Sequence, residues 1–188
     1  MLNKIIENRP KIHTRNITLA TYPHTDSKVL VHGILKDERY INVFDITGSM
    51  LAPGIVHHLD VKLLIKPAPL TIEDAQAMMI KVPMPECPET LDTIEKLKGL
   101  EIRSGFSKNI RNIMGGKKGC THLCTLIIAM GQEIVHGWLT HKRKDESPVP
   151  KNIENFSEKN YIIDSCRMWT SHGPKITAFE QAIKSRIE

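Results

Sequence analysis

Apolar and polar residues alternate along the first part of the chain with the period of two that β-strands show. The alternation runs through residues 12–22 and again through residues 28–36, and residues 23–27 between them supply a turn. Two alternating runs joined by a short turn are the pattern of a hairpin. We therefore predict that these two segments pair as antiparallel strands.

Two more strands are predicted downstream of a loop. Residues 43–54 are interrupted by glycine and proline, which favours a loop. Residues 56–65 alternate again, so that His57 falls on the apolar face of a third strand and His58 on the opposite face. Residues 70–82 are extended in character and are predicted to contain a fourth strand.

Helical spacing of apolar residues replaces the alternation in the second half of the chain. It predicts helices over residues 89–98 and 106–114, a third from near Cys120 to at least Ile134, and a last one over residues 176–187. A chain that places its strands first and its helices afterwards forms an α+β domain. We predict an antiparallel three- to four-stranded sheet that is covered on one face by the helices.

The length of 188 residues fits one domain with an extension. We expect a core domain over residues 11–141 and, over residues 142–188, a linker and a C-terminal helical extension packed on the core. The four cysteines are scattered and no charged-then-apolar leader precedes them, which indicates a cytoplasmic protein with reduced thiols. No apolar run is long enough to predict a membrane span.

The net charge of +5 suits an anionic partner, but aromatic residues make up only 5% of the chain and do not interleave with the basic ones. A nucleic-acid-binding surface needs basic residues gathered in a stripe and not merely a basic total. Nucleic acid is therefore disfavoured as a partner. A small-molecule substrate and assembly into a homo-oligomer both stay open.

Cys120 lies in the most chemically suggestive stretch of the sequence. Three glycines and two lysines, within residues 115–119, precede it, and an apolar helix follows. The unpaired N–H groups of a helix start and the nearby ammonium groups favour the thiolate, which is the form that attacks electrophiles or binds metal. The same pattern fits an ordinary helix start with an inert, buried cysteine. Cys124, one helical turn later, is explained by packing alone.

Six short runs along the chain form a recognisable set. They are His13-Thr14-Arg15, Gly54-Ile55-Val56-His57, Pro83 followed by Cys87, Gly99-Leu100-Glu101-Ile102 through Gly105-Phe106, Gly119-Cys120-Thr121-His122-Leu123, and Ile163-Asp164-Ser165-Cys166. Together they resemble the bacterial domain-of-unknown-function 2889 family, from about residue 11 onward. The run that contains Cys120 and His122 is the most specific. The family name implies no activity, but the resemblance directs attention to these polar residues.

The order of the polar residues is more distantly similar to the U-type iron–sulfur scaffold proteins. Those proteins bring a cysteine and an aspartate from a strand region, a cysteine from a loop and a histidine–cysteine pair from a helix start around one metal site. The resemblance implies the same kind of fold, with Cys87 as the loop cysteine and Cys120 as the helix-start cysteine. His57 or His58 stands in place of the strand cysteine.

Two thiolates and one imidazole make a tetrahedral-capable site that suits zinc or iron better than magnesium or calcium. The candidate metal ligands are His57, His58, Cys87, Cys120 and Cys166. Three protein ligands leave a coordination position at which a water or a substrate oxygen is activated. Asp60 or His122 is then the candidate catalytic residue that shuttles the proton.

These residues favour a metal-dependent enzyme, a lyase or hydrolase that acts on a small molecule. The alternative is a noncatalytic carrier of a metal or an iron–sulfur cluster, and a third hypothesis is a sulfur carrier that uses Cys87 or Cys120 alone. We favour the enzyme because the chain lacks the strand cysteine and helix-start histidine that cluster assembly would use.

Overall fold

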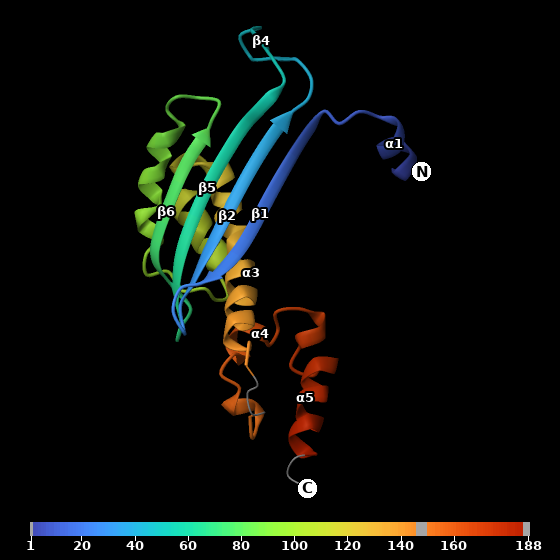
Figure 1. The fold of residues 1–188 in the computed structure, drawn as a ribbon, viewed down its shortest axis with the longest axis vertical. Coiled ribbons are helices and arrows are strands. Elements are labelled where there is room, and N and C mark those ends of the chain that lie inside the picture. Colours follow the sequence, from blue (N-terminus) through green and yellow to red (C-terminus); the bar gives the residue numbers. More distant parts are fainter. Residues whose placement is uncertain (1, 146–149, 186–188) are drawn as a thin grey trace. The chain divides into compact units, whose positions relative to one another are not determined.

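The computed structural model describes residues 2–145 and 150–185. The chain divides into two compact units, Met1–Trp138 and Leu139–Glu188. The first unit contains a four-stranded antiparallel sheet in the order β1-β2-β5-β6 (Figure 1). Its strands are β1 (His13–Pro23), β2 (Val29–Arg39), β5 (Gly54–Lys66) and β6 (Thr71–Lys81). The predicted α+β class and antiparallel sheet are confirmed.

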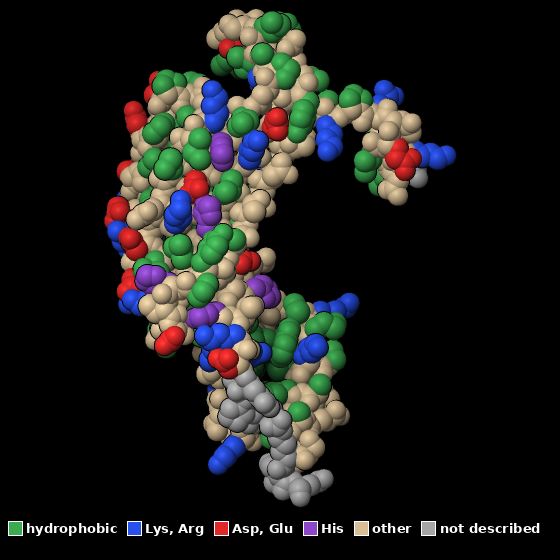
Figure 2. All heavy atoms as spheres, viewed as in Figure 1, with side chains coloured by type: hydrophobic (Ala, Val, Ile, Leu, Met, Phe, Trp, Pro, Cys, Tyr) green, Lys and Arg blue, Asp and Glu red, His purple; other side chains and the backbone are tan. Residues whose placement is uncertain are grey.

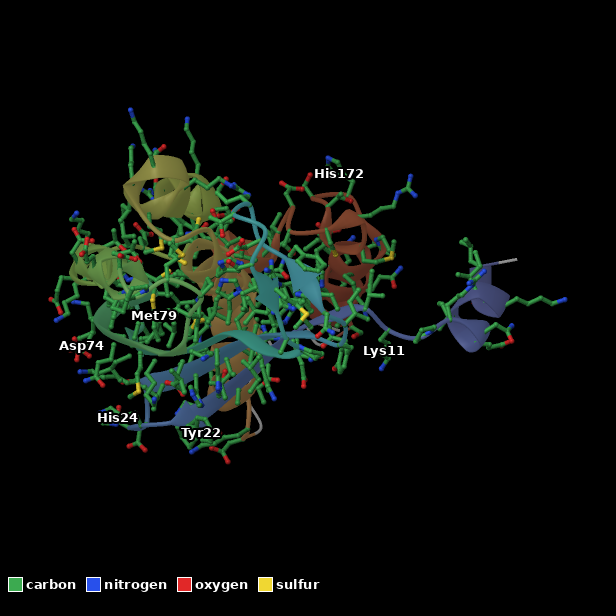
Figure 3. All side chains as sticks on the ribbon, turned by 90° about the horizontal axis from the view of Figure 1, so that it is seen from above. Lys11, Tyr22, His24, Asp74, Met79 and His172 are labelled. Atoms are coloured by element: carbon green, nitrogen blue, oxygen red, sulfur yellow. The ribbon has the colours of Figure 1, made fainter. Side chains whose placement is uncertain are left out.

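Alternate residues of the two central strands are buried, as the sequence pattern predicts. Leu59, Val61 and Leu63 of β5 and Leu35 of β2 have no exposed surface. These side chains face the helices, which lie on one side of the sheet in Figures 1 and 3. The other face of the sheet is open, and its side chains are half-buried or exposed.

Apart from a short helix at the N-terminal end, the helices of the first unit follow β6. The structure has the 3₁₀ segments η1 (Cys87–Thr93), η2 (Glu95–Leu97) and η3 (Gly116–Lys118), and the α-helices α2 (Phe106–Met114) and α3 (Thr121–Lys142). The two α-helices fall where the sequence predicts them.

The α-helix predicted over residues 89–98 is wrong in type, because this segment is 3₁₀. Its hydrogen bonds run over three residues, from the Ile94 N–H to the Leu91 carbonyl and from the Leu97 N–H to the Ile94 carbonyl. The apolar residues repeat at intervals of three, which matches the three residues per turn of this helix. The same spacing also occurs on α-helices, so the sequence pattern could not separate them.

Two features of the first unit were not predicted. The helix α1 (Leu2–Asn8) has no buried residue, so no apolar face signals it. The loop at residues 43–54 contains a short hairpin, β3 (Val43–Phe44) paired with β4 (Met50–Leu51). Its turn is closed by Asp45, whose carboxylate accepts the backbone N–H groups of Thr47 and Ser49. Such turns are local and leave no periodic signal in the sequence.

Three glycines allow α3 to lie close to its neighbours. A Cβ at Gly33 on β2 would lie 2.8 Å from the Met130 sulfur, and one at Gly131 would lie 2.8 Å from the Phe106 ring. A Cβ at Gly137 would lie 2.5 Å from the Cβ of Thr21 on β1, which is closer than real Cβ contacts. Helix α3 therefore packs along the sheet with little freedom to move toward it.

Helix α3 is also, by length and composition alone, the one helix among the described residues that could cross a membrane. The buried core helix of a soluble protein passes the same test. Eight residues of α3 are buried, and it packs on a sheet through glycine contacts. We therefore interpret α3 as a core helix.

The second unit contains η4 (Ile153–Asn155), α4 (Lys159–Ile162), η5 (Arg167–Trp169) and α5 (Pro174–Lys184). Buried Glu158 pairs with Lys142, and the Phe156 and Phe179 rings lie 5.2 Å apart. The connection predicted over residues 142–156 and the helix predicted over 176–187 lie partly outside the described residues.

Replacing Gly137 with alanine should destabilise the protein, although alanine is the better helix former. The new methyl group meets Thr21, so helix and strand must separate, and we expect a loss of about 1–3 kcal/mol in the free energy of unfolding. Urea unfolding monitored by circular dichroism measures this loss. Gln132→Ala, at an exposed position of α3, is the control and should change stability by less than about 0.5 kcal/mol. A more stable Gly137→Ala protein would show that α3 does not pack as described.

Candidate metal centre

Three polar residues form a row across the sheet on the face that carries the core. Arg15 of β1 lies directly opposite Asp37 of β2, and Asp37 lies directly opposite His57 of β5. The apolar alternation of β2 places Asp37 on the buried face, two residues beyond Leu35. Directly opposed residues on one face have Cβ atoms about 5 Å apart, so their side chains meet.

Asp37 is the centre of this row. Its side chain is 2% exposed, and Arg15 binds both of its oxygens, since Nε donates to Oδ1 and Nη2 donates to Oδ2, each at 2.7 Å. Burial alone would raise the pKa of the Asp37 carboxyl, but the hydrogen bonds and charge of Arg15 outweigh burial and hold that pKa below its ordinary value. Asp37 is therefore a buried carboxylate that stays ionised.

Two histidines meet at the same carboxylate oxygen. Nδ1 of His57 lies 3.1 Å from Oδ2 of Asp37, and Nε2 of His122 lies 3.5 Å from it. The two imidazole rings are stacked, with centroids 3.7 Å apart and planes inclined by 28°. One donor atom from each of Asp37, His57 and His122 lies within 4.8 Å of the others, and we call these three residues the Asp–His–His cluster.

Both histidines have a lowered pKa. Burial is the main cause at His57, where it outweighs the attraction of Asp37. Burial is also the main cause at His122, and a charge on His57 or Arg15 would add to it. Both pKa values lie below the ordinary 6.5, which favours the neutral form of each ring at neutral pH. A neutral imidazole is the form that binds a metal or accepts a proton.

Helix α3 places His122 at the cluster, and the thiol of Cys120, at the start of this helix, lies beside His122. The Cys124 N–H donates to the Cys120 carbonyl at 2.9 Å, so Cys120 lies at the start of the helix, as predicted. The Cys120 sulfur lies 3.9 Å from Nδ1 of His122, the ring nitrogen that does not face Asp37. A chain of polar contacts thus runs from Cys120 through His122 to Asp37 and Arg15.

The open face of the sheet holds two other predicted site residues. His58 and Asp60 alternate with His57 and therefore point away from the cluster. The Asp60 carboxylate is bound by His32 at 2.7 Å and by Lys62. Figure 2 shows this face, on which histidine, lysine and acidic side chains lie together over the middle of the sheet. The structure brings neither residue to the cluster.

The remaining predicted ligands, Cys87 and Cys166, are not members of the cluster. Cys87 is half-buried at the start of η1, and Cys166 is exposed in the second unit. Within residues 2–145 and 150–185, no group of three metal-ligating side chains includes either of them. Cys124 is buried and its thiol pKa is raised by burial, which agrees with its predicted packing role.

The sequence analysis missed Asp37 and gave Arg15 no role. The second strand was predicted to end at residue 36, whereas β2 continues to Arg39. One more period of the alternation places Asp37 on the apolar face, and a carboxylate at such a position is a strong signal because buried acids need a partner. Arg15, the fourth residue of the first predicted strand, is the cationic partner of Asp37.

Arg15→Met should destabilise the protein mainly at neutral pH. Removal of one partner leaves the Asp37 carboxylate buried without a cation, which costs about 3–5 kcal/mol for a fully buried pair. Arg15 is 39% exposed, so solvent screening reduces the expected loss to about 1–3 kcal/mol. The wild-type Asp37 pKa is lowered, so the stability that Arg15 gives is complete above the unfolded pKa of about 3.9 and is lost as pH falls through the folded value.

Urea unfolding at pH 7 and at pH 3 measures this difference. Lys108→Met, at an exposed position on α2, is the matched control and should leave stability unchanged at both pH values. If the free energies of unfolding of wild type and Arg15→Met differ equally at both pH values, the loss of stability comes from packing and not from charge.

Comparison with known proteins identifies the family of this chain. A model of the family described as Protein of unknown function (DUF2889) matches residues 13–136, a span that contains the Asp–His–His cluster, Arg15 and Cys120. Comparisons with curated proteins and with solved structures give no significant match. The predicted likeness to the U-type iron–sulfur scaffold proteins is therefore not shown. The chain belongs to the DUF2889 family of proteins of unknown function.

Proposed function

We propose that this protein is a metal-dependent enzyme, a hydrolase or lyase that acts on a small molecule, with the metal held by the Asp–His–His cluster. One observation carries this proposal: a buried carboxylate and two imidazoles converge with their donor atoms within 4.8 Å of one another. The side chains come from β2, β5 and α3, so segments far apart in the sequence supply one ligand each.

The separations between donor atoms suit a single ion. Two ligand atoms that each lie about 2.1 Å from an ion are about 3.0–3.4 Å apart at octahedral or tetrahedral angles. Oδ2 of Asp37 lies 3.1 Å from Nδ1 of His57 and 3.5 Å from Nε2 of His122. The two histidine nitrogens lie within 4.8 Å of one another and their rings are stacked, so the rings must turn for both nitrogens to face one ion.

The donor set points to zinc or iron. Two imidazoles and one carboxylate are the ligand set of many catalytic zinc sites and of the facial triad of non-haem Fe(II) enzymes. Such a set leaves a coordination position for water or a substrate oxygen, and this is the position at which a hydrolase or lyase activates its substrate. Zinc is the first choice for a reaction without electron transfer.

Arg15 supports the site in two ways. It keeps Asp37 ionised, which is the form of the carboxyl that binds a cation. It also fixes the plane of the carboxylate through two parallel hydrogen bonds. Oδ2 accepts one of these hydrogen bonds and one from Nδ1 of His57, and the lone pair that faces His57 becomes free for an ion when that ring nitrogen gives up its proton. Arg15 is thus a positioning residue and not a ligand.

Cys120 has a supporting place in this arrangement. When Nε2 of His122 binds an ion, the ring proton is on Nδ1 and points toward the Cys120 sulfur. Among the described residues, Cys120 is the one thiol with a polar contact to the cluster. An iron–sulfur cluster requires about four thiolate-type ligands, so the carrier hypothesis has less support than the enzyme.

Removal of either histidine should abolish metal binding. After incubation of metal-free protein with zinc and removal of the excess, wild type should retain about one zinc per chain by elemental analysis. His57→Ala and His122→Ala should each retain less than about a tenth of that amount, because two ligands bind far more weakly than three. His58→Ala is the matched control, since His58 is the next residue but lies on the opposite face, and it should retain full zinc. Zinc loss in His58→Ala alone would place the metal on the open face.

Cys120→Ser separates this ligand set from the one that the sequence predicts. If Cys120 only accepts a hydrogen bond from His122, the variant should keep its stoichiometry and lose at most about tenfold in zinc affinity. Competition with a chromophoric chelator measures the affinity. Cys87→Ser should behave like wild type. Complete zinc loss in both cysteine variants would show that the two cysteines are ligands and that the Asp–His–His cluster does not hold the metal.

A further inference from the structure

A groove of about 730 Å³ opens at the end of the sheet where β5 begins. Strand β4 of the β3–β4 hairpin, the first residues of β5 and the end of β6 line it, and Figure 1 shows the hairpin at this end of the sheet. Nine of its thirteen lining residues are apolar, three are basic and one is glycine, so none is acidic. Its size lies within the range of small-molecule sites.

The groove is unusual because its apolar walls are exposed and its two charged residues, Arg39 and Lys81, are both cations. Met50 is 61% exposed and Ile80 is 52% exposed. The basic residues are Arg39, His58 and Lys81. Apolar walls favour a ligand with hydrocarbon surface, and cations without acids favour a negative charge on it.

Arg39 is the residue of the groove that we expect to bind a negatively charged group of the ligand. Its Nη2 donates to the Ala52 carbonyl at 2.7 Å, so the guanidinium is held at the hairpin. Its Nε is buried and has no hydrogen-bond partner among the described residues. Because Nε has almost no accessible surface, a carboxylate in the groove would bind the terminal guanidinium nitrogens, and a carboxylate accepts strongly from a guanidinium.

Arg39, at one edge of the groove, lies close to the Asp–His–His cluster in the sheet, whereas His58 and Lys81 line the groove on the open face. Arg39 follows Asp37 by two residues on β2, which is about 7 Å along the strand, and Gly54 pairs with Arg39 three residues before His57 on β5. A ligand whose carboxylate lies at Arg39 is therefore within the length of a small molecule from the cluster.

We infer that this groove binds a small apolar carboxylate, with its anionic group on Arg39 and its hydrocarbon part against the β3–β4 hairpin. As the substrate subsite of the proposed enzyme this inference rests on the proposed function, but binding itself uses none of the cluster residues. The substrate class of the enzyme is then apolar organic acids.

The test is calorimetric titration of the metal-free full-length protein with decanoate, with decyltrimethylammonium as the probe of equal chain length and opposite charge. We expect one decanoate per chain and at least tenfold weaker binding of the cation. Arg39→Gln should weaken decanoate binding roughly tenfold, which is the cost of one charge-assisted hydrogen bond, whereas Arg39→Lys should retain most of it. Lys66→Gln, at an exposed lysine that does not line the groove, is the control.

Two variants of opposite charge at Ile80 provide a second test, which does not depend on the hydrogen bond between Arg39 and the hairpin. Ile80 is half-exposed, so Ile80→Glu and Ile80→Lys should both fold, and decanoate should bind the lysine variant more tightly than the glutamate variant. His57→Ala should lose zinc but keep decanoate, so failure of the metal site and failure of the groove give different results. Equal binding of both probes would overturn the inference, as would a dimer in which the groove is closed to decanoate.

Discussion

The salt bridge between Arg15 and Asp37 is the interaction on which the rest of the site depends. A carboxylate with 2% of its side chain exposed cannot stay ionised inside a protein without a cation, and Arg15 supplies one from the neighbouring strand. The pair fixes the position of Oδ2, and both histidines meet this oxygen. The sheet register thus creates a charged point inside the apolar layer between sheet and helices.

The second requirement is the position of α3. His57 shares a sheet with Asp37, but His122 reaches the carboxylate only because its helix lies close to the strands. Glycines at the contacts with β1, β2 and α2 allow that approach, since a methyl group at any of them would meet a neighbouring residue. The hydrophobic core therefore does more than stabilise the fold, because it holds the third member of the cluster in place.

Strand periodicity predicted the sheet, the face of His57 and the helix that begins after Cys120, because these features follow from local repeats of two and 3.6 residues. The site needed more than local information. Asp37 was missed because the predicted second strand ended at residue 36, one residue before it, whereas β2 continues to Arg39. Cys87 was grouped with Cys120 on a resemblance, and neither cysteine is a member of the Asp–His–His cluster. Register and helix placement decide which distant residues meet, and a single sequence does not contain either directly.

If Asp37, His57 and His122 bind one metal ion, the zinc-loaded protein has no cysteine ligand. X-ray absorption of the zinc-loaded protein tests it most directly, because sulfur and nitrogen or oxygen ligands differ in distance and scattering. We expect a shell of nitrogen and oxygen atoms at about 2.0–2.1 Å from the zinc, outer-shell scattering from two imidazole rings, and no sulfur at about 2.3 Å. A sulfur shell at about 2.3 Å, or a spectrum without imidazole scattering, would contradict it.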